Sequence, residues 1–234
     1  MKVKKLTRTV LEDVADVLSN GGIVCFPTDT IYGLLADASN GEAVERLYSI
    51  RRPSGRPFLL LIPNVAWLRD LGLMFTERHE ALVQTYPATF IFYKWNRLPL
   101  FLTRSGKSLA VRKPKAQSHV FELLKILNVP LVAPSANPEG EKPATTVKEA
   151  MQYFGDKVDL YINGGTRKGK PSTIVRLMYP KGIRLVREGN IQFKYIFDFY
   201  TNFKPISFSL PAVALSEFFS LDPFEIDLPF LPPR

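Results

Sequence analysis

The sequence predicts an α/β protein whose sheet contains both parallel and antiparallel strands. Short apolar segments, which are typical of strands, alternate along the chain with longer segments whose apolar side chains recur at helical spacing. The last two apolar segments are joined by Tyr179-Pro180-Lys181-Gly182, a turn sequence that favours an antiparallel hairpin. The 234 residues, 46% of them hydrophobic, can bury one sizeable core, and this composition excludes a disordered or fibrous chain.

Each element is predicted from its local pattern. Residues 9–20 predict an amphipathic helix that ends at Gly21 and Gly22. Residues 23–27 predict a buried strand that ends at Pro27, because proline has no N–H for a neighbouring strand. A polar loop is expected next. Further helices are predicted at 41–51, 64–71, 76–85, 117–127 and 145–154, and further strands at 58–62, 90–93, 109–112, 131–133, 158–162, 173–178 and 183–186.

The charge distribution favours a polyanionic ligand. The chain carries a net charge of +9, and residues 1–190 hold 28 Lys and Arg against 17 Asp and Glu, a net charge of +11. Such an excess attracts nucleotide phosphates or RNA. A basic soluble protein without either ligand would have the same composition, so charge alone does not decide between them.

The chain is expected to be cytoplasmic. Its longest apolar runs are too short to span a bilayer, so no association with a membrane is predicted. Lys2, Lys4 and Lys5 resemble the start of a signal peptide, but acidic residues interrupt the apolar stretch that should follow. The single cysteine, Cys25, excludes an intramolecular disulfide, and its apolar neighbours indicate a buried side chain rather than a nucleophile.

The polar segment after the strand at 23–27 is the most informative feature. Phe26-Pro27-Thr28-Asp29-Thr30-Ile31-Tyr32-Gly33-Leu34 places two hydroxyls and a carboxylate at the end of a strand, where α/β sheets bind ligands. Four motifs follow in order: Ala110-Val111-Arg112-Lys113-Pro114, Ala133-Pro134-Ser135-Ala136-Asn137, Lys170-Pro171-Ser172-Thr173-Ile174-Val175 and Leu185-Val186-Arg187-Glu188-Gly189. Together they resemble the YrdC/Sua5 family of threonylcarbamoyl-adenylate synthases over roughly residues 7–190, which implies a single twisted open mixed sheet flanked by helices.

This resemblance implies an ATP-dependent nucleotidyltransferase. It would condense L-threonine, bicarbonate and ATP to L-threonylcarbamoyl-AMP and pyrophosphate, with Mg²⁺ carried in by ATP. A partner tRNA threonylcarbamoyl transferase would then move the group onto the adenosine next to the anticodon of certain tRNAs, so tRNA or double-stranded RNA is a further candidate ligand. No catalytic acid or base is expected, because the carbamate attacks the α-phosphate and the enzyme mainly positions reactants and neutralises charge.

The resemblance also assigns two pockets residue by residue. The threonine pocket would contain Thr30, Arg112 and Ser172, with Arg112 facing the substrate carboxylate. At the lysine of the family's Lys-x-Arg-Pro motif this chain has either Ile50 or Arg51, and we prefer Arg51 because a buried isoleucine cannot bind phosphate. A histidine that some members place beside threonine aligns with Leu61. The nucleotide would be bound by Arg51, Arg52, Arg56, Ser108, Ala133, Ser135, Asn137, Pro143 and Arg187.

No other motif indicates a catalytic or metal site. His79 and His119 are the only histidines, and both are expected at the surface, without the spacing of a metal site. The chain has neither a G-x-x-x-x-G-K-[ST] loop nor a G-x-G-x-x-G sequence, which excludes the nucleotide sites that these motifs build. Asn163-Gly164-Gly165 predicts a plain turn.

Residues 191–234 are predicted to be a short aromatic- and proline-rich extension of the domain formed by residues 1–190. Eleven of these 44 residues are aromatic, their net charge is −2, and helical spacing is present only at 190–200. So many aromatic side chains predict that the extension packs on the domain or on a partner.

Two alternatives to the synthase stay open. A non-catalytic module could bind RNA through its basic surface, but RNA-backbone binding does not need the small polar set of Thr30, Ser135 and Asn137. The second alternative is a carbamoyl-adenylate-forming enzyme, similar to the YrdC-like domain of hydrogenase-maturation carbamoyltransferases. Those proteins carry acylphosphatase and zinc-finger regions, which a one-cysteine chain of this length lacks.

Overall fold

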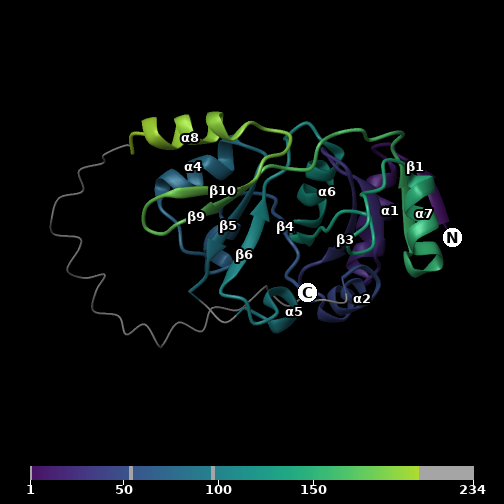
Figure 1. Cartoon of the computed structure of the whole chain (residues 1–234). Helices are drawn as coiled ribbons and strands as arrows, with labels where there is room; N and C mark the ends of the chain where they lie inside the picture. The colour runs from purple at the N-terminus through teal and green to yellow at the C-terminus, as the bar shows by residue number, and fades with distance from the viewer. Residues whose placement is uncertain (1, 53–54, 96–97, 206–234) are drawn as a thin grey trace.

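The computed structural model describes residues 2–52, 55–95 and 98–205, and within them it has the expected α/β architecture (Figure 1). The strands are β1 (Lys2–Lys5), β2 (Val24–Pro27), β3 (Tyr32–Asp37), β4 (Leu60–Leu61), β5 (Thr89–Tyr93), β6 (Ser108–Arg112), β7 (Leu131–Val132), β8 (Leu160–Asn163), β9 (Ile174–Leu177) and β10 (Ile183–Arg187). The helices are α1 (Val10–Ser19), α2 (Gly41–Arg51), α3 (Trp67–Asp70), α4 (Glu77–Thr85), α5 (Leu100–Thr103), α6 (His119–Leu127), α7 (Val147–Phe154) and α8 (Phe193–Asn202), with a 3₁₀ turn at Gly155–Lys157.

The strands of the described residues form a single sheet in the order β1-β8-β2-β3-β7-β4-β6-β5-β9-β10. The pairs β1–β8, β8–β2, β4–β6 and β5–β9 are parallel, and the other neighbours are antiparallel. The mixed sheet is therefore confirmed, as is the hairpin that joins β9 to β10. None of the helices in the described ranges combines the length and apolarity needed to cross a membrane.

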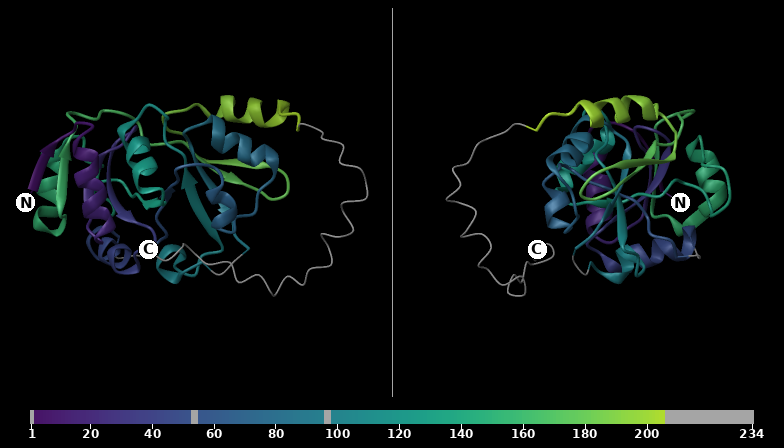
Figure 2. Two further views of the ribbon diagram at one scale, coloured as in Figure 1. Left: turned by 180° about the vertical axis from the view of Figure 1, so that it is seen from behind. Right: turned by 60° about the vertical axis from the view of Figure 1, so that its left-hand side comes forward.

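Side chains on the two faces of the sheet enter two separate cores. In β2, Cys25 belongs to one core and Val24 to the other, as expected of a strand buried on both faces. One face is covered by α1 and α6, with Leu18 and Val120 fully buried between them and the sheet. The opposite face is covered by the remaining longer helices α2, α4, α7 and α8, so the sheet forms the middle layer of the molecule (Figure 2).

Two strands were not anticipated. The polar loop expected after β2 is only a short turn, and β3 returns antiparallel to β2 with every side chain buried. Its apolar run is interrupted by Gly33 and directly follows the polar residues of the turn, so the local pattern predicted a loop instead. The exposed β1 is rich in lysine, and its backbone pairing with β8 at the sheet edge stabilises it rather than any apolar face.

The prediction for His79 is wrong, because its side chain is fully buried. Its Nδ1 accepts a hydrogen bond from the Thr76 N–H at 3.4 Å, at the start of α4, and its ring stacks on Tyr200 of α8 with centroids 5.9 Å apart. Burial, and then the nearby charge of Arg78, lower the pKa of His79 to about 4. Cys25 is buried as predicted, and burial raises the pKa of its thiol to about 12.

The first part of the extension lies along α4, where α8 is close to the position that the sequence indicated (Figure 1). Ile196 and Tyr200 point inward and are buried. The Tyr86 hydroxyl donates to the Tyr195 carbonyl at 3.0 Å, and the Gly182 N–H donates to the Tyr200 hydroxyl at 2.6 Å. Residues 206–234, the rest of the predicted extension, lie outside the described residues.

Candidate functional site

A cavity of about 190 Å³ lies where the turn between β2 and β3 faces the end of β6. Eight of the twelve site residues predicted from the sequence line it, although they come from distant parts of the chain. They are Thr30, Arg52, Arg112, Ala133, Ser135, Pro143, Ser172 and Arg187. The remaining lining is mainly apolar and includes Ile31, Phe58, Leu59, Leu61, Pro171 and Ile174.

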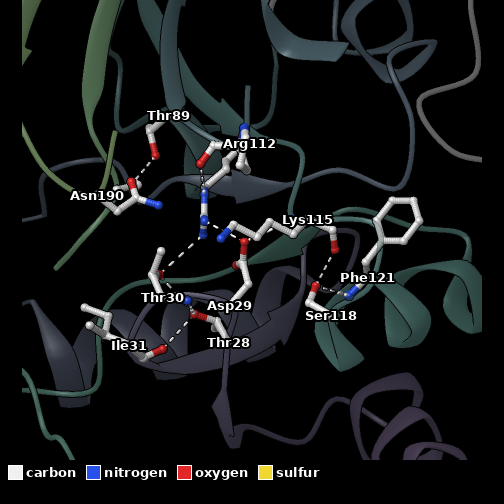
Figure 3. A network of polar contacts seen from close by, with 12 residues as sticks. Thr28, Asp29, Thr30, Ile31, Thr89, Arg112, Lys115, Ser118, Phe121 and Asn190 are labelled. Atoms are coloured by element: carbon white, nitrogen blue, oxygen red, sulfur yellow. Dashed lines mark hydrogen bonds and ion pairs between the residues drawn. The ribbon is translucent and has the colours of Figure 1, made fainter. Parts of the chain in front are cut away.

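One wall of the cavity is built around a buried ion pair (Figure 3). Arg112 Nη2 donates to Asp29 Oδ2 at 2.8 Å, and Nε donates to the Pro87 carbonyl at 3.1 Å. The same Asp29 oxygen accepts from the backbone N–H of Lys115 at 3.1 Å. Arg112 Nη1 points toward the Thr30 hydroxyl at 3.5 Å, so this end of the guanidinium faces the cavity (Figure 3).

The turn itself is braced by its own hydroxyl groups. The Thr28 hydroxyl donates to the Ile31 carbonyl at 2.6 Å and accepts from the Thr30 N–H at 3.2 Å. Such local side-chain to backbone bonds are what make threonine and aspartate frequent in turns. They hold the Thr30 side chain beside Arg112. Burial lowers the pKa of Arg112, and the adjacent Asp29 carboxylate opposes this shift.

Ser172 lies on the same side of the cavity. Its hydroxyl is 2.7 Å from the Thr89 hydroxyl, at the first residue of β5, and its carbonyl accepts from Arg187 Nη2 at 3.0 Å. These contacts join the segment before β9 to β5 and β10. The three residues predicted for the threonine pocket are therefore neighbours of the same cavity.

On the other side, Arg51 lies behind the cavity wall rather than in it. Its Nε donates to the Ser135 carbonyl at 2.9 Å and its Nη2 to the Ser135 hydroxyl at 3.2 Å. Burial, and then the neighbouring Arg52, lower the pKa of Arg51 to about 10. Its buried Nη1 has no hydrogen-bond partner among the described residues. Arg51 thus orients Ser135 and adds a positive charge beside the cavity.

Four of the twelve predicted residues do not line the cavity: Arg51, Arg56, Ser108 and Asn137. Arg56 is exposed and lies 3.5 Å from the Glu139 carboxylate. Ser108 begins β6, at the opposite end from Arg112. The Asn137 amide is buried and donates to the carbonyls of Pro138 and Glu141, both at 2.8 Å, so it braces the loop.

Asp29 and Thr28 were not among the predicted site residues, although both belong to the first motif. A carboxylate placed directly after a buried strand was the available signal for Asp29. No cluster of three or more His, Cys, Asp and Glu side chains that could hold a metal ion occurs within the described ranges.

The chain is similar to known proteins of one family. The family model Sua5_yciO_yrdC, described as telomere recombination, matches residues 16–189. A threonylcarbamoyl-AMP synthase of Pyrococcus abyssi is 32% identical over 168 residues, which are 70% of this chain and 49% of that protein. The chain thus spans about half the length of this curated relative.

Solved structures show the same fold. The crystal structure of P. abyssi Sua5 complexed with L-threonine has a TM-score of 0.74 and 29% identity, and the match covers 85% of this chain and 59% of the other. The E. coli YciO structure has a TM-score of 0.70 over 82% of this chain and 96% of YciO, and at 24% identity it supports the fold alone. The family match and the curated relative together show that this chain belongs to the Sua5/YciO/YrdC family.

Proposed function

We propose that this chain synthesises L-threonylcarbamoyl-AMP from L-threonine, bicarbonate and ATP, with release of pyrophosphate. The observation that supports it best is that Arg112 and Thr30 line the same cavity as Arg52 and Ser135. One side offers a guanidinium and hydroxyls for an amino acid, and the other offers a cation and a hydroxyl for phosphate. A relative in P. abyssi is named as this synthase, and a solved relative contains threonine.

In this reaction the threonine amine attacks CO₂ derived from bicarbonate and loses a proton to form a carbamate. A carbamate oxygen then attacks the α-phosphate, and the bond to the pyrophosphate oxygen breaks. Arg112 Nη1 would bind the threonine carboxylate, with Thr30 and Ser172 next to it. Nε already donates to the Pro87 carbonyl and Nη2 to Asp29. The threonine carboxylate would therefore approach the guanidinium at Nη1.

The nucleotide would occupy the side of the cavity lined by Arg52, Ala133, Ser135 and Pro143, and Arg187, which donates to the Ser172 carbonyl, would contact it from the border with the threonine pocket. ATP would enter as its Mg²⁺ complex, so the metal belongs to the substrate. The arginines would help Mg²⁺ to neutralise the negative charge of the leaving pyrophosphate. The apolar lining, including Leu59, Leu61 and Ile174, limits the access of water. A carbamate loses CO₂ readily in water, so this exclusion would extend its lifetime.

The product would pass to a tRNA threonylcarbamoyl transferase, which modifies the adenosine next to the anticodon. In this role the protein would act in tRNA processing. The proposal needs no acid or base from the protein for the phosphoryl step, because the carbamate is already anionic and pyrophosphate leaves with its charge neutralised.

The test is pyrophosphate release from ATP by the purified chain with threonine, bicarbonate and Mg²⁺, each omitted in turn. We expect release only when all are present, together with a threonine-containing adenylate detected by mass spectrometry. Release that is equal with and without threonine would show that the synthase proposal is wrong. Carbamoyl phosphate in place of threonine and bicarbonate tests the carbamoyl-adenylate alternative in the same assay.

The net charge of +11 on residues 1–190 is the one observation that favours an RNA-binding module. If RNA only contacts the basic rim of the nucleotide side, binding should be weak, steeply salt-dependent and indifferent to sequence. Tight binding that survives high salt, without any pyrophosphate release, would favour the RNA-binding module instead.

A further inference from the structure

Four planar side chains lie against one another between the surface and the cavity. The rings of Tyr48 and Phe58 are nearly parallel, with centroids 4.1 Å apart and an interplanar angle of 12°. The guanidinium of Arg104 lies over the Tyr48 ring, with Cζ 3.7 Å from its centroid, and that of Arg52 lies over Phe58 at 5.0 Å. Because Phe58 and Arg104 are both this close to Tyr48, they occupy opposite faces of its ring. We call these residues the four-residue stack.

The outer end of the four-residue stack is anchored. Arg104 forms an ion pair with Glu45, which lies on α2 one turn before Tyr48. The Tyr48 hydroxyl accepts a hydrogen bond from the Phe58 N–H at 3.2 Å, which fixes the two rings relative to each other. Tyr48 and Phe58 are both almost completely buried, so neither ring can turn without disturbing the core.

The inner end of the stack is Arg52, whose side chain lines the cavity together with Phe58. Arg52 Nη1 donates to the carbonyls of Arg56 at 3.2 Å and Pro57 at 3.3 Å. Its Nε is buried and has no hydrogen-bond partner among the described residues. Nη1 is therefore used by the protein, whereas the N–H of Nε is left for an anion, although the Glu139 carboxylate also interacts with this guanidinium.

We propose that Tyr48 and Arg104 are positioning residues that hold the Arg52 guanidinium, through Phe58, for a phosphate group in the cavity. This inference rests on the proposed function for the identity of the nucleotide. A free arginine side chain loses about 2 kcal/mol of rotamer entropy when it is fixed. Arg52 lies over Phe58, whose ring is held by Tyr48, so part of its rotamer freedom is already lost before the phosphate binds. Less conformational entropy is then lost on binding.

The first measurement needs no ligand. The ¹⁵N relaxation of the Arg52 Nε–H group reports whether this side chain is ordered. We expect an ordered group in the wild type and in Tyr48→Phe, which keeps the ring, and a mobile group in Tyr48→Leu, which removes it. Because Tyr48 is almost completely buried, Arg104→Met provides a second test at a side chain that is 27% exposed, and it should give an intermediate effect.

The second measurement is calorimetry with ATP, inorganic pyrophosphate and threonine. Tyr48→Leu should weaken ATP and pyrophosphate binding about tenfold, Arg104→Met about threefold, and neither should change threonine binding more than about twofold. Arg69→Met is the matched control, because Arg69 also lies over a ring, that of Phe75 at 6.0 Å, and next to the Glu80 carboxylate, but away from the cavity. It should bind all three ligands as the wild type does.

The proposal is overturned if Arg52 is equally ordered in Tyr48→Leu and Arg104→Met, or if it becomes mobile without any loss of ATP and pyrophosphate affinity. A folding defect alone would weaken threonine binding to the same extent, and that result also contradicts it. Since the relaxation measurement and pyrophosphate binding do not require turnover, the role of the stack is decided even if the protein proves not to make the threonylcarbamoyl adenylate.

Discussion

Arg112 and Asp29 form an ion pair that is almost completely removed from solvent, with side chains only 4% and 3% exposed and a distance of 2.8 Å between Nη2 and Oδ2. The two residues are 83 positions apart in the chain. Each has a further backbone partner, the Pro87 carbonyl and the Lys115 N–H respectively. Removing one member of such a pair leaves an uncompensated buried charge. The pair is thus part of the protein's stability as well as of its candidate threonine pocket.

We expect Arg112→Ala to lower the free energy of unfolding by about 3–5 kcal/mol, because Asp29 is left buried and unpaired. The same variant should weaken threonine binding about ten- to a hundredfold. Urea denaturation and calorimetry measure the two effects. The double variant Arg112→Ala with Asp29→Ala should recover much of the stability but none of the threonine affinity.

Arg52→Ala is the matched control for this prediction, since Arg52 lines the other side of the same cavity. It should weaken ATP binding and leave threonine binding intact. If Arg112→Ala keeps its threonine affinity, or if both variants lose only ATP affinity, the assignment of the two pockets is wrong.

Gly169 should be intolerant of any side chain because the chain before β9 passes close to the first motif. A Cβ at this position would lie 2.5 Å from the Thr30 carbonyl oxygen, so the backbone of Thr30 would have to move. Gly169→Ala should therefore lower kcat/KM for threonine about ten- to a hundredfold, as small displacements of positioning groups do. The neighbouring exposed Lys168→Ala is the control, and steady-state kinetics that showed equal values for both variants would contradict the prediction.

His79 should make the protein less stable in mild acid. Its pKa is lowered from 6.5 to about 4 in the folded protein, so between these values the unfolded chain binds a proton that the folded protein does not. The contribution of His79 to the free energy of unfolding should therefore be constant above pH 6.5. As the pH decreases from 6.5 to 4, this contribution should fall by up to about 3 kcal/mol.

Chemical denaturation of the wild type and of His79→Gln between pH 4 and 7.5 checks this. The side chain of Gln does not titrate, so the variant should lose this part of the pH dependence while other groups contribute equally to both proteins. Parallel stability curves for the two proteins would show that His79 does not titrate as expected.

The packing of α8 can be tested with two adjacent residues. Ile196 is fully buried against the core, whereas Phe197 is 46% exposed. Ile196→Ala should lower the free energy of unfolding by about 2–5 kcal/mol, because it leaves a cavity where α8 packs on the core. Phe197→Ala should change it by less than about 0.5 kcal/mol. Equal effects on the thermal midpoint would mean that α8 does not pack on the domain in solution.

Local patterning was sufficient for most elements. The helices α1, α2, α4, α6 and α7 lie within a few residues of their predicted ranges, because helical spacing of apolar residues is contained in a single segment. In contrast, β3 was missed, since Gly33 interrupts its apolar residues and the polar residues just before it predict a loop. The β1 strand was missed because only its pairing with β8, which is distant in sequence, stabilises it.

The sequence by itself determined the α/β class, the order of the five motifs and the resemblance to the Sua5/YciO/YrdC family. Only the tertiary structure decided that His79 is buried. Its neighbours in the chain are charged, and the ring that covers it belongs to Tyr200, which is distant in sequence. The tertiary structure also decided that Arg51 supports Ser135 from behind the cavity, and that Asp29 neutralises Arg112. The physical reason is the same in each case: periodicity and turn propensity act within a segment, whereas burial and ion pairing depend on which distant segments the packed sheet brings together.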